Sequence, residues 1–262
     1  MLPIRDINPA STTPLATVAL VAICAIVFIY QLALGVSEGP FAAQAFVYRH
    51  GLIPFEIAHG VKLTPHPSRL PHPLSLFEWR EEMRLQLVGE PVRGFGEAVR
   101  LLYLPIILSI FMHGSIVHLG LNMLFLWIFG NNVEDAMGHI RFLFFYLICG
   151  AAAGLIHLVT NLNSQIPTIG ASGAIAGVMG AYLVLYPRAR ILTLVPLFFY
   201  FTFVELPAVV FLGIWFLMQL LMARSGGDVA WFAHIGGFIA GLFLVRKFVR
   251  YSPRSRGRYR GW

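Results

Sequence analysis

The stretch Gly170-Ala171-Ser172-Gly173 stands at the head of an apolar run, Ser172–Tyr186. A serine between two glycines lets another chain come close to its hydroxyl oxygen. Small residues follow it: Ala174, Ala176, Gly177, Gly180 and Ala181. This pattern is typical of a helix that packs closely against other helices in a membrane. We therefore expect Ser172 to begin a tightly packed membrane helix and to be the reactive centre of the chain.

The composition predicts a membrane protein with several apolar helices. Of 262 residues, 58% are apolar and only 12% are charged, and the mean hydropathy is +0.74. A soluble core of this size does not need so many apolar stretches of bilayer length. The net charge of +7 arises from a basic tail, Arg246–Arg260, directly after an apolar helix. Such a tail favours a topology and lipid-headgroup signal, so we expect no nucleic-acid partner.

Six apolar segments are expected to cross the bilayer. They are Pro14–Gly35, a segment from near His113 to Gly130, Ile140–Thr160, Ser172–Tyr186, Leu206–Met222 and Val229–Arg250. Pro105 is expected to break the long run before His113, and Asn131–His139 to form a short loop. Ile191–Phe203 is only about 13 residues long and contains Pro196, so we expect an interfacial hairpin there.

These segments predict one membrane domain. Residues 1–13 are expected to be a short cytoplasmic leader, residues 14–250 the membrane domain, and residues 251–262 a basic cytoplasmic tail. A long extracytoplasmic loop, about residues 36–112, holds Pro-rich patches and a candidate amphipathic helix at Leu76–Val88. Arg141, Arg188, Arg190 and the tail place both termini on the cytoplasmic side. With no organellar targeting peptide evident, we expect a multi-pass protein of a bacterial cell inner membrane, its active site opening to the extracytoplasmic side.

Polar residues from three of these helices fall at similar depths. Ser172 begins a helix from the outer face, and His234, His118 and Asn122 lie a few residues into helices from that face. Imidazole is the usual base for a serine hydroxyl that attacks a carbonyl. Asn122 can donate to the developing oxyanion, with His118 as a second donor. No carboxylate lies at this depth, so we expect a Ser172–His234 dyad without an acidic third member.

The other histidines have weaker signals. His118 and Asn122 share a helix face, whereas His113 points about 140° away if the helix is continuous. We expect His113 to orient a loop rather than to touch the reacting carbonyl. His157 has no motif around it and is expected to be structural. The remaining histidines are expected to be solvated: His50, His59, His66, His72 and His139.

Four motifs occur in order along the chain. They are His113-Gly-x-x-x-His118-Leu-x-x-Asn122-Met, Phe129-Gly130-x-x-x-Glu134, Gly170-Ala-Ser172-Gly173 and Ala233-His234-x-x-Gly237-x-x-x-Gly241. With these motifs, the region from about His113 to Leu244 resembles the rhomboid intramembrane serine proteases. The resemblance implies an all-α, six-helix bundle with a water-filled cavity open to the outside. It also implies cleavage of transmembrane-segment substrates near the outer face.

The resemblance also implies roles for individual residues. Ser172 would be the nucleophile and His234 the base, and an oxyanion hole would form from His118, Asn122 and the Ser172 backbone N–H. His113 would support the first loop, and Gly170 and Gly173 would flank the nucleophile. Gly237 and Gly241 form a close-packing surface that would draw His234 toward Ser172. No metal or cofactor is expected, and the expected partners are single-pass or polytopic membrane proteins in the lipid bilayer.

Two positions depart from the family pattern. Some members carry Tyr or Phe four residues after the nucleophile, where this chain has Ala176, so packing or another ring must hold the imidazole. Some members carry Trp-Arg shortly before the first histidine, whereas Trp79-Arg80 lies well upstream here.

Two other functions compete with a protease. A transporter is disfavoured because the chain has no repeat halves, and charged residues other than histidine lie only near the ends of the expected helices. An inactive rhomboid-like protein would bind membrane clients without cutting them, but such proteins lose the serine or the histidine, and this chain has both. A zinc protease would need His-Glu-x-x-His, which His113–His118 does not provide.

Overall fold

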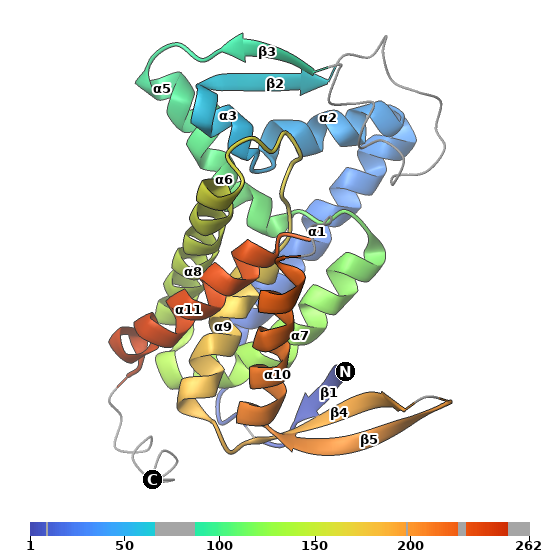
Figure 1. Cartoon of the computed structure of the whole chain (residues 1–262), viewed down its shortest axis with the longest axis vertical. Helices are drawn as coiled ribbons and strands as arrows, with labels where there is room; N and C mark the ends of the chain where they lie inside the picture. Colours follow the sequence, from blue (N-terminus) through green and yellow to red (C-terminus); the bar gives the residue numbers. More distant parts are fainter. Residues whose placement is uncertain (9, 66–86, 198, 225–228, 251–262) are drawn as a thin grey trace.

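The chain folds into a bundle of apolar helices with a small cap at one end and a sheet at the other (Figure 1). The computed structural model describes residues 1–8, 10–65, 87–197, 199–224 and 229–250. Within these ranges, four helices are long and apolar enough to cross a membrane: α1 (Leu15–Ser37), α7 (Ile116–Met137), α8 (His139–Thr160) and α11 (Trp231–Phe248). Two shorter apolar helices, α9 (Ser172–Leu185) and α10 (Ala208–Met222), pack with them.

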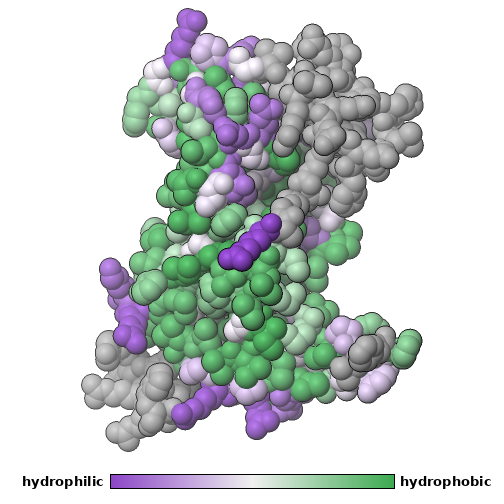
Figure 2. Space-filling model, viewed as in Figure 1, coloured by the Kyte–Doolittle hydropathy of each residue, from purple (hydrophilic) through white to green (hydrophobic). Residues whose placement is uncertain are grey.

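Apolar side chains cover the middle of the bundle, and hydrophilic side chains gather mainly toward its two ends (Figure 2). This distribution is the one that a bilayer requires of a protein crossing it. The predicted mostly helical membrane fold is confirmed at this level.

α9 lies at the centre of the bundle, in contact with α7, α8, α10 and α11. Its small residues allow α11 to approach very closely. A Cβ atom at Gly237 would overlap the carbonyl oxygen of Gly173, and one at Gly241 would overlap that of Gly177. The glycines therefore hold the first turns of α9 and α11 side by side.

The segment before α7 is broken, as expected near Pro105. A short helix α5 (Phe95–Ala98) leads into a π-helical turn (Val99–Tyr103), α6 (Leu104–Leu108) and a 3-10 turn (Ser109–Phe111). Pro105 lies in the first turn of α6, where its missing N–H is not needed. α7 then begins at Ile116, and the Ser115 hydroxyl caps it by accepting from the His118 N–H at 3.1 Å.

The predicted loop Asn131–His139 is wrong. α7 continues to Met137, and only Gly138, with φ of +78°, separates it from α8. The loop was predicted because Glu134 and Asp135 are rare residues inside membrane helices, but both have partners here. Asp135 accepts hydrogen bonds from Ser11 and Thr12, which precede α1.

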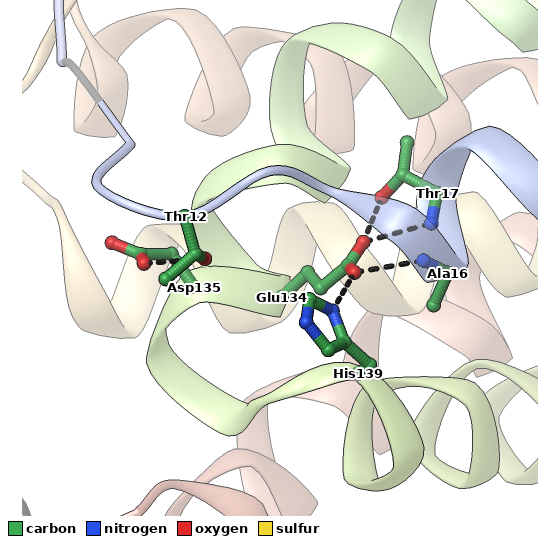
Figure 3. Close-up of polar contacts among 6 residues, drawn as sticks. All are labelled: Thr12, Ala16, Thr17, Glu134, Asp135 and His139. Carbon is green, nitrogen blue, oxygen red and sulfur yellow. Dashed lines mark hydrogen bonds and ion pairs between the residues drawn. The ribbon is translucent and has the colours of Figure 1, made fainter.

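The Glu134 carboxylate is fully buried and caps the start of α1 (Figure 3). It accepts from the backbone N–H groups of Ala16 at 2.8 Å and Thr17 at 2.7 Å, and from the Thr17 hydroxyl at 2.7 Å. These N–H groups are among those that a helix start leaves without partners, and α1 has no side-chain cap of its own. His139 also bonds to Glu134, at 2.5 Å, while its side chain is 43% exposed, as expected of a solvated residue.

Two small sheets lie at opposite ends of the bundle (Figure 1). β4 (Arg190–Leu197) and β5 (Tyr200–Pro207) form an antiparallel hairpin, so the expected hairpin in place of a crossing at Ile191–Phe203 is confirmed. β1 (Leu2–Asp6) also pairs with β4, a pairing that we did not expect of the leader.

The cap comprises α2 (Pro40–His50), α3 (Pro54–His59), β2 (Val61–Pro65) and β3 (Leu87–Pro91), with β2 and β3 antiparallel. The predicted amphipathic helix Leu76–Val88 falls largely outside the described residues, and its last two residues are in β3, not in a helix. Pro71–Pro73 and the tail 251–262 also lie outside them.

Candidate active site

Ser172 and His234 lie side by side, at the first turns of α9 and α11. The Ser172 Oγ and the His234 Nε2 are 2.7 Å apart, within hydrogen-bonding distance. The hydroxyl donates in this pair when Nε2 carries a lone pair, which is the arrangement that a general base requires. The two side chains thus meet as expected, while their catalytic roles stay a prediction.

The other ring nitrogen of His234 faces a residue that we did not predict. Its Nδ1 is 2.8 Å from the Oε1 of Gln219, on α10, and the Gln219 side-chain amide donates to the Trp215 carbonyl at 3.1 Å. Only carboxylates were expected as partners of a catalytic imidazole, so this amide is not among the predicted residues. A lone glutamine in the otherwise apolar segment Ala208–Met222 was the signal that could have identified it.

Two tryptophan rings pack beside the His234 imidazole. The centroids of Trp215 and Trp231 both lie 6.0 Å from that of the imidazole, at interplanar angles of 36° and 87°. Ala176, by contrast, is fully buried within α9. Rings from α10 and α11 therefore occupy the surroundings of the imidazole, where some family members use an aromatic residue of the serine helix.

Asn122 and His118 each retain a side-chain donor. The Asn122 amide donates one N–H to the His118 carbonyl at 2.9 Å, which leaves its second N–H. The His118 Nδ1 accepts from the Gly114 N–H at 3.4 Å, a long contact that favours the tautomer with the ring proton on Nε2. That Nε2 lies against Gly170, where φ is +130° and a Cβ would come within 2.8 Å of it. Glycine at this position leaves room for the imidazole.

In a continuous helix, His113 would point away from His118. The structure has no continuous helix here, and His113 lies beside His118. The chain is non-helical between the 3-10 turn and α7, and the two imidazole rings meet edge-on with centroids 5.1 Å apart. The His113 backbone N–H and carbonyl both pair with the Gln31 side chain of α1, at 3.3 Å. His113 therefore ties the start of α7 to α1.

The polar residues of the candidate site line one cavity of about 630 Å³. Its lining includes Ser172, His234, His118, Asn122, Gly170 and Gly173, together with apolar residues such as Phe125 and Met179. Gly173 also packs tightly, since a Cβ there would collide with Ala153. In the part of the chain that the structure describes, no cluster of three histidine, cysteine or acidic residues could hold a metal ion.

The cavity wall also includes His157 and the segment that leads to Ser172. The His157 Nε2 pairs with the Thr168 hydroxyl at 2.9 Å, a contact that fits its expected structural role. Thr168 exchanges two backbone hydrogen bonds with Leu52 of the cap, at 2.8 and 3.1 Å. The cap is thereby joined to the loop that positions the serine.

Comparison with known proteins gives one consistent result. A family model described as the Rhomboid domain matches residues 100–251. The chain is 34% identical over 150 residues to "Rhomboid protein 1, mitochondrial" of Saccharomyces cerevisiae, covering 53% of this chain and 40% of that protein. It is 32% identical over 145 residues to "Presenilin-associated rhomboid-like protein A, mitochondrial" of Danio rerio, covering 54% and 37%. It is 30% identical over 171 residues to "RHOMBOID-like protein 6, mitochondrial" of Arabidopsis thaliana, covering 59% and 51%.

The alignments span about half or less of the length of these relatives, and all three are named as mitochondrial proteins. Their location overturns the expectation of a bacterial cell inner membrane. That expectation depended on finding no targeting peptide. This is a poor guide to location for a chain that aligns with only part of its relatives. The matched range contains all four motifs, and it covers more than half of this chain. The chain therefore belongs to the rhomboid family.

Proposed function

We propose that the chain is an intramembrane serine endopeptidase that cleaves membrane-protein substrates at or beside a transmembrane segment. The observation that carries the proposal is the 2.7 Å contact between the Ser172 Oγ and the His234 Nε2. These two atoms belong to a cavity large enough to admit a strand of peptide, and Asn122 and His118 line the same cavity. A nucleophile, a base and two donors in one cavity are the groups that amide hydrolysis needs.

In the proposed reaction, the Ser172 Oγ attacks the carbonyl carbon of the scissile peptide bond while its proton passes to the His234 Nε2. The proton then moves to the leaving nitrogen as the C–N bond breaks, which leaves an acyl ester on Ser172. Water attacks this ester and gives a proton to Nε2, and that proton returns to Oγ as the acid leaves. No metal or organic cofactor takes part.

The oxyanion of each tetrahedral intermediate would be stabilised by the free Asn122 N–H, the His118 Nε2–H and the Ser172 backbone N–H. The last of these is at a helix start, where N–H groups have no partner within the helix. The substrate helix must unwind locally, because its carbonyls are otherwise hydrogen-bonded within the helix.

We also propose that six helices cross the membrane, namely α1, α7, α8, α9, α10 and α11. Residues 14–250 would form the membrane domain, with residues 1–13 and 251–262 on one face. Two contacts support the placement of both termini on one face. β1 pairs with β4 of the hairpin, and the Arg250 N–H donates to the Ala136 carbonyl near the end of α7. The basic residues Arg141, Arg188 and Arg190 favour this face as the non-translocated one. The loop of about residues 36–112 would then lie on the opposite face, near the cavity.

The names of the relatives support a mitochondrial membrane as the location of this chain. Its substrates would then be membrane proteins of that compartment, embedded in the same bilayer.

Labelling with a fluorophosphonate tests the proposed function directly, because this reagent phosphonylates an activated serine. The full chain in detergent micelles is expected to be labelled at Ser172, and Ser172→Ala and His234→Ala are expected to lose the label. Ser109→Ala is the matched control, since Ser109 lines the same cavity and bonds only weakly to the Ile106 carbonyl at 3.4 Å. Wild-type protein that stays unlabelled, and does not cleave a membrane substrate, would leave a non-catalytic client binder as the better account.

A further inference from the structure

We propose that Gln219 is a positioning residue for His234, so that Ser172, His234 and Gln219 form a hydrogen-bonded chain of three members. The inference rests on the proposed protease function and extends it to α10. Ser172 and His234 come from α9 and α11, and the motifs place no partner for the other ring nitrogen of His234.

The orientation of the Gln219 amide follows from its second hydrogen bond. The Nε2 of Gln219 is 3.1 Å from the Trp215 carbonyl, which is an acceptor, so this atom is the NH₂ group. The atom 2.8 Å from the His234 Nδ1 is then the amide oxygen, which cannot donate. The proton in this contact must therefore belong to Nδ1. Neutral imidazole with a proton on Nδ1 has its lone pair on Nε2, which faces the Ser172 hydroxyl.

The glutamine in the Gln219–His234 contact is buried. Gln219 is 4% exposed, and it lies behind His234 rather than on the cavity wall. Among the described residues, its hydrogen bond to His234 is its one side-chain link to another helix. An amide in an apolar helix is expected to have such a partner, because an unpaired one is costly in a bilayer.

α10 also supplies the Trp215 ring beside the imidazole, one helical turn before Gln219. One face of α10 therefore contributes both a hydrogen bond and a packing surface to His234. This explains how the imidazole is held when the position four residues after the nucleophile is Ala176. A neutral amide fixes the tautomer without bringing a charge into the membrane.

The test compares Gln219→Leu, which removes the acceptor at similar volume, with Gln219→Glu, which retains one. Gln219→Leu is expected to lower kcat by roughly 2- to 13-fold, the factor for one neutral hydrogen bond. KM is expected to stay unchanged, because Gln219 does not line the cavity. Gln219→Glu is expected to recover most of the lost rate. Leu220→Ala, on the exposed side of the same helix, is the control and is expected to keep wild-type kinetics.

Nitrogen-15 NMR of histidine-labelled full chain in detergent micelles supplies a readout that a structural role alone would not change. The His234 signals are identified by their loss in His234→Ala. They are expected to show protonated Nδ1 in wild-type protein and a mixture of tautomers in Gln219→Leu. If folded Gln219→Leu keeps the wild-type tautomer and kcat, the inference is overturned, even if that variant is less stable. If wild-type protein has the Nδ1–H tautomer but is never labelled by fluorophosphonate, the proposed function fails instead.

Discussion

Replacement of Gly237 by alanine tests the helix contact that brings the two reactive side chains together. The added Cβ would overlap the carbonyl oxygen of Gly173, a backbone atom that cannot rotate away. To restore an ordinary contact, α9 and α11 must separate by about 1 Å or more. The same movement would lengthen the 2.7 Å contact between the Ser172 Oγ and the His234 Nε2 beyond hydrogen-bonding range. A misplacement of about 1 Å can lower turnover by roughly 100-fold, and we expect a loss of that order.

The assay is the rate of cleavage of a membrane substrate in liposomes, with fluorophosphonate labelling as a second measure. Gly213→Ala is the matched control, because a Cβ at Gly213 of α10 would meet nothing within 4 Å. It is expected to keep wild-type activity and to be slightly more stable, as alanine favours the helix. If Gly237→Ala retained activity within threefold of wild type, close packing of α9 and α11 would not be what aligns the two side chains.

Three further predictions address the oxyanion donors and the polar groups at the sheet end of the bundle. Asn122→Ala is expected to slow turnover by about 10²- to 10³-fold, as for loss of one oxyanion donor, and a loss below about threefold would exclude that role. Glu134→Ala is expected to lower the free energy of unfolding by about 2–6 kcal/mol, because two backbone N–H groups at the start of α1 lose their acceptor. The control is Glu205→Ala, which removes an exposed ion pair with Arg190 at 3.4 Å. In denaturant titrations, this variant should change the free energy of unfolding by less than about 1 kcal/mol. Burial raises the pKa of Asp6 to about 6, so the folded state binds a proton more tightly than the unfolded chain, and stability should fall as pH rises from about 4 to 6. Asp6→Asn should lack this part of the pH dependence in thermal unfolding, and identical slopes in both proteins would contradict the assignment.

Most of the helix bundle could be predicted from the sequence because hydropathy is a local property. α8 was expected at Ile140–Thr160 and begins one residue earlier. The serine helix was expected to begin at Ser172 and does so, and the hairpin followed from a run too short to cross. Each of these predictions needs only the length of an apolar run and the position of a proline.

The errors arose where a distant contact decides the structure. Glu134 was placed in a loop because carboxylates are rare in membrane helices, but the start of α1, 117 residues away in sequence, supplies its partners. Gln219 was missed because it meets His234 only after α10 and α11 have packed together. The direction expected of His113 held only for a continuous helix, and that condition is not met because the chain breaks before α7. Sequence spacing carries no information on such pairings.

The hairpin has a consequence for the site, although it lies at the other end of the bundle. α9 begins at Ser172 beside the cavity and ends near β4, and the hairpin reverses the chain so that α10 runs back toward the cavity. Gln219 lies near the end of α10, and His234 lies near the start of α11. If Ile191–Phe203 had crossed the membrane as a helix, α11 would begin at the opposite face, and His234 would lie a bilayer thickness from Ser172. The number of membrane crossings between α9 and α11 therefore decides whether Ser172 and His234 lie at the same face. The glycine contacts between α9 and α11 then bring these two residues to the distance that proton transfer needs.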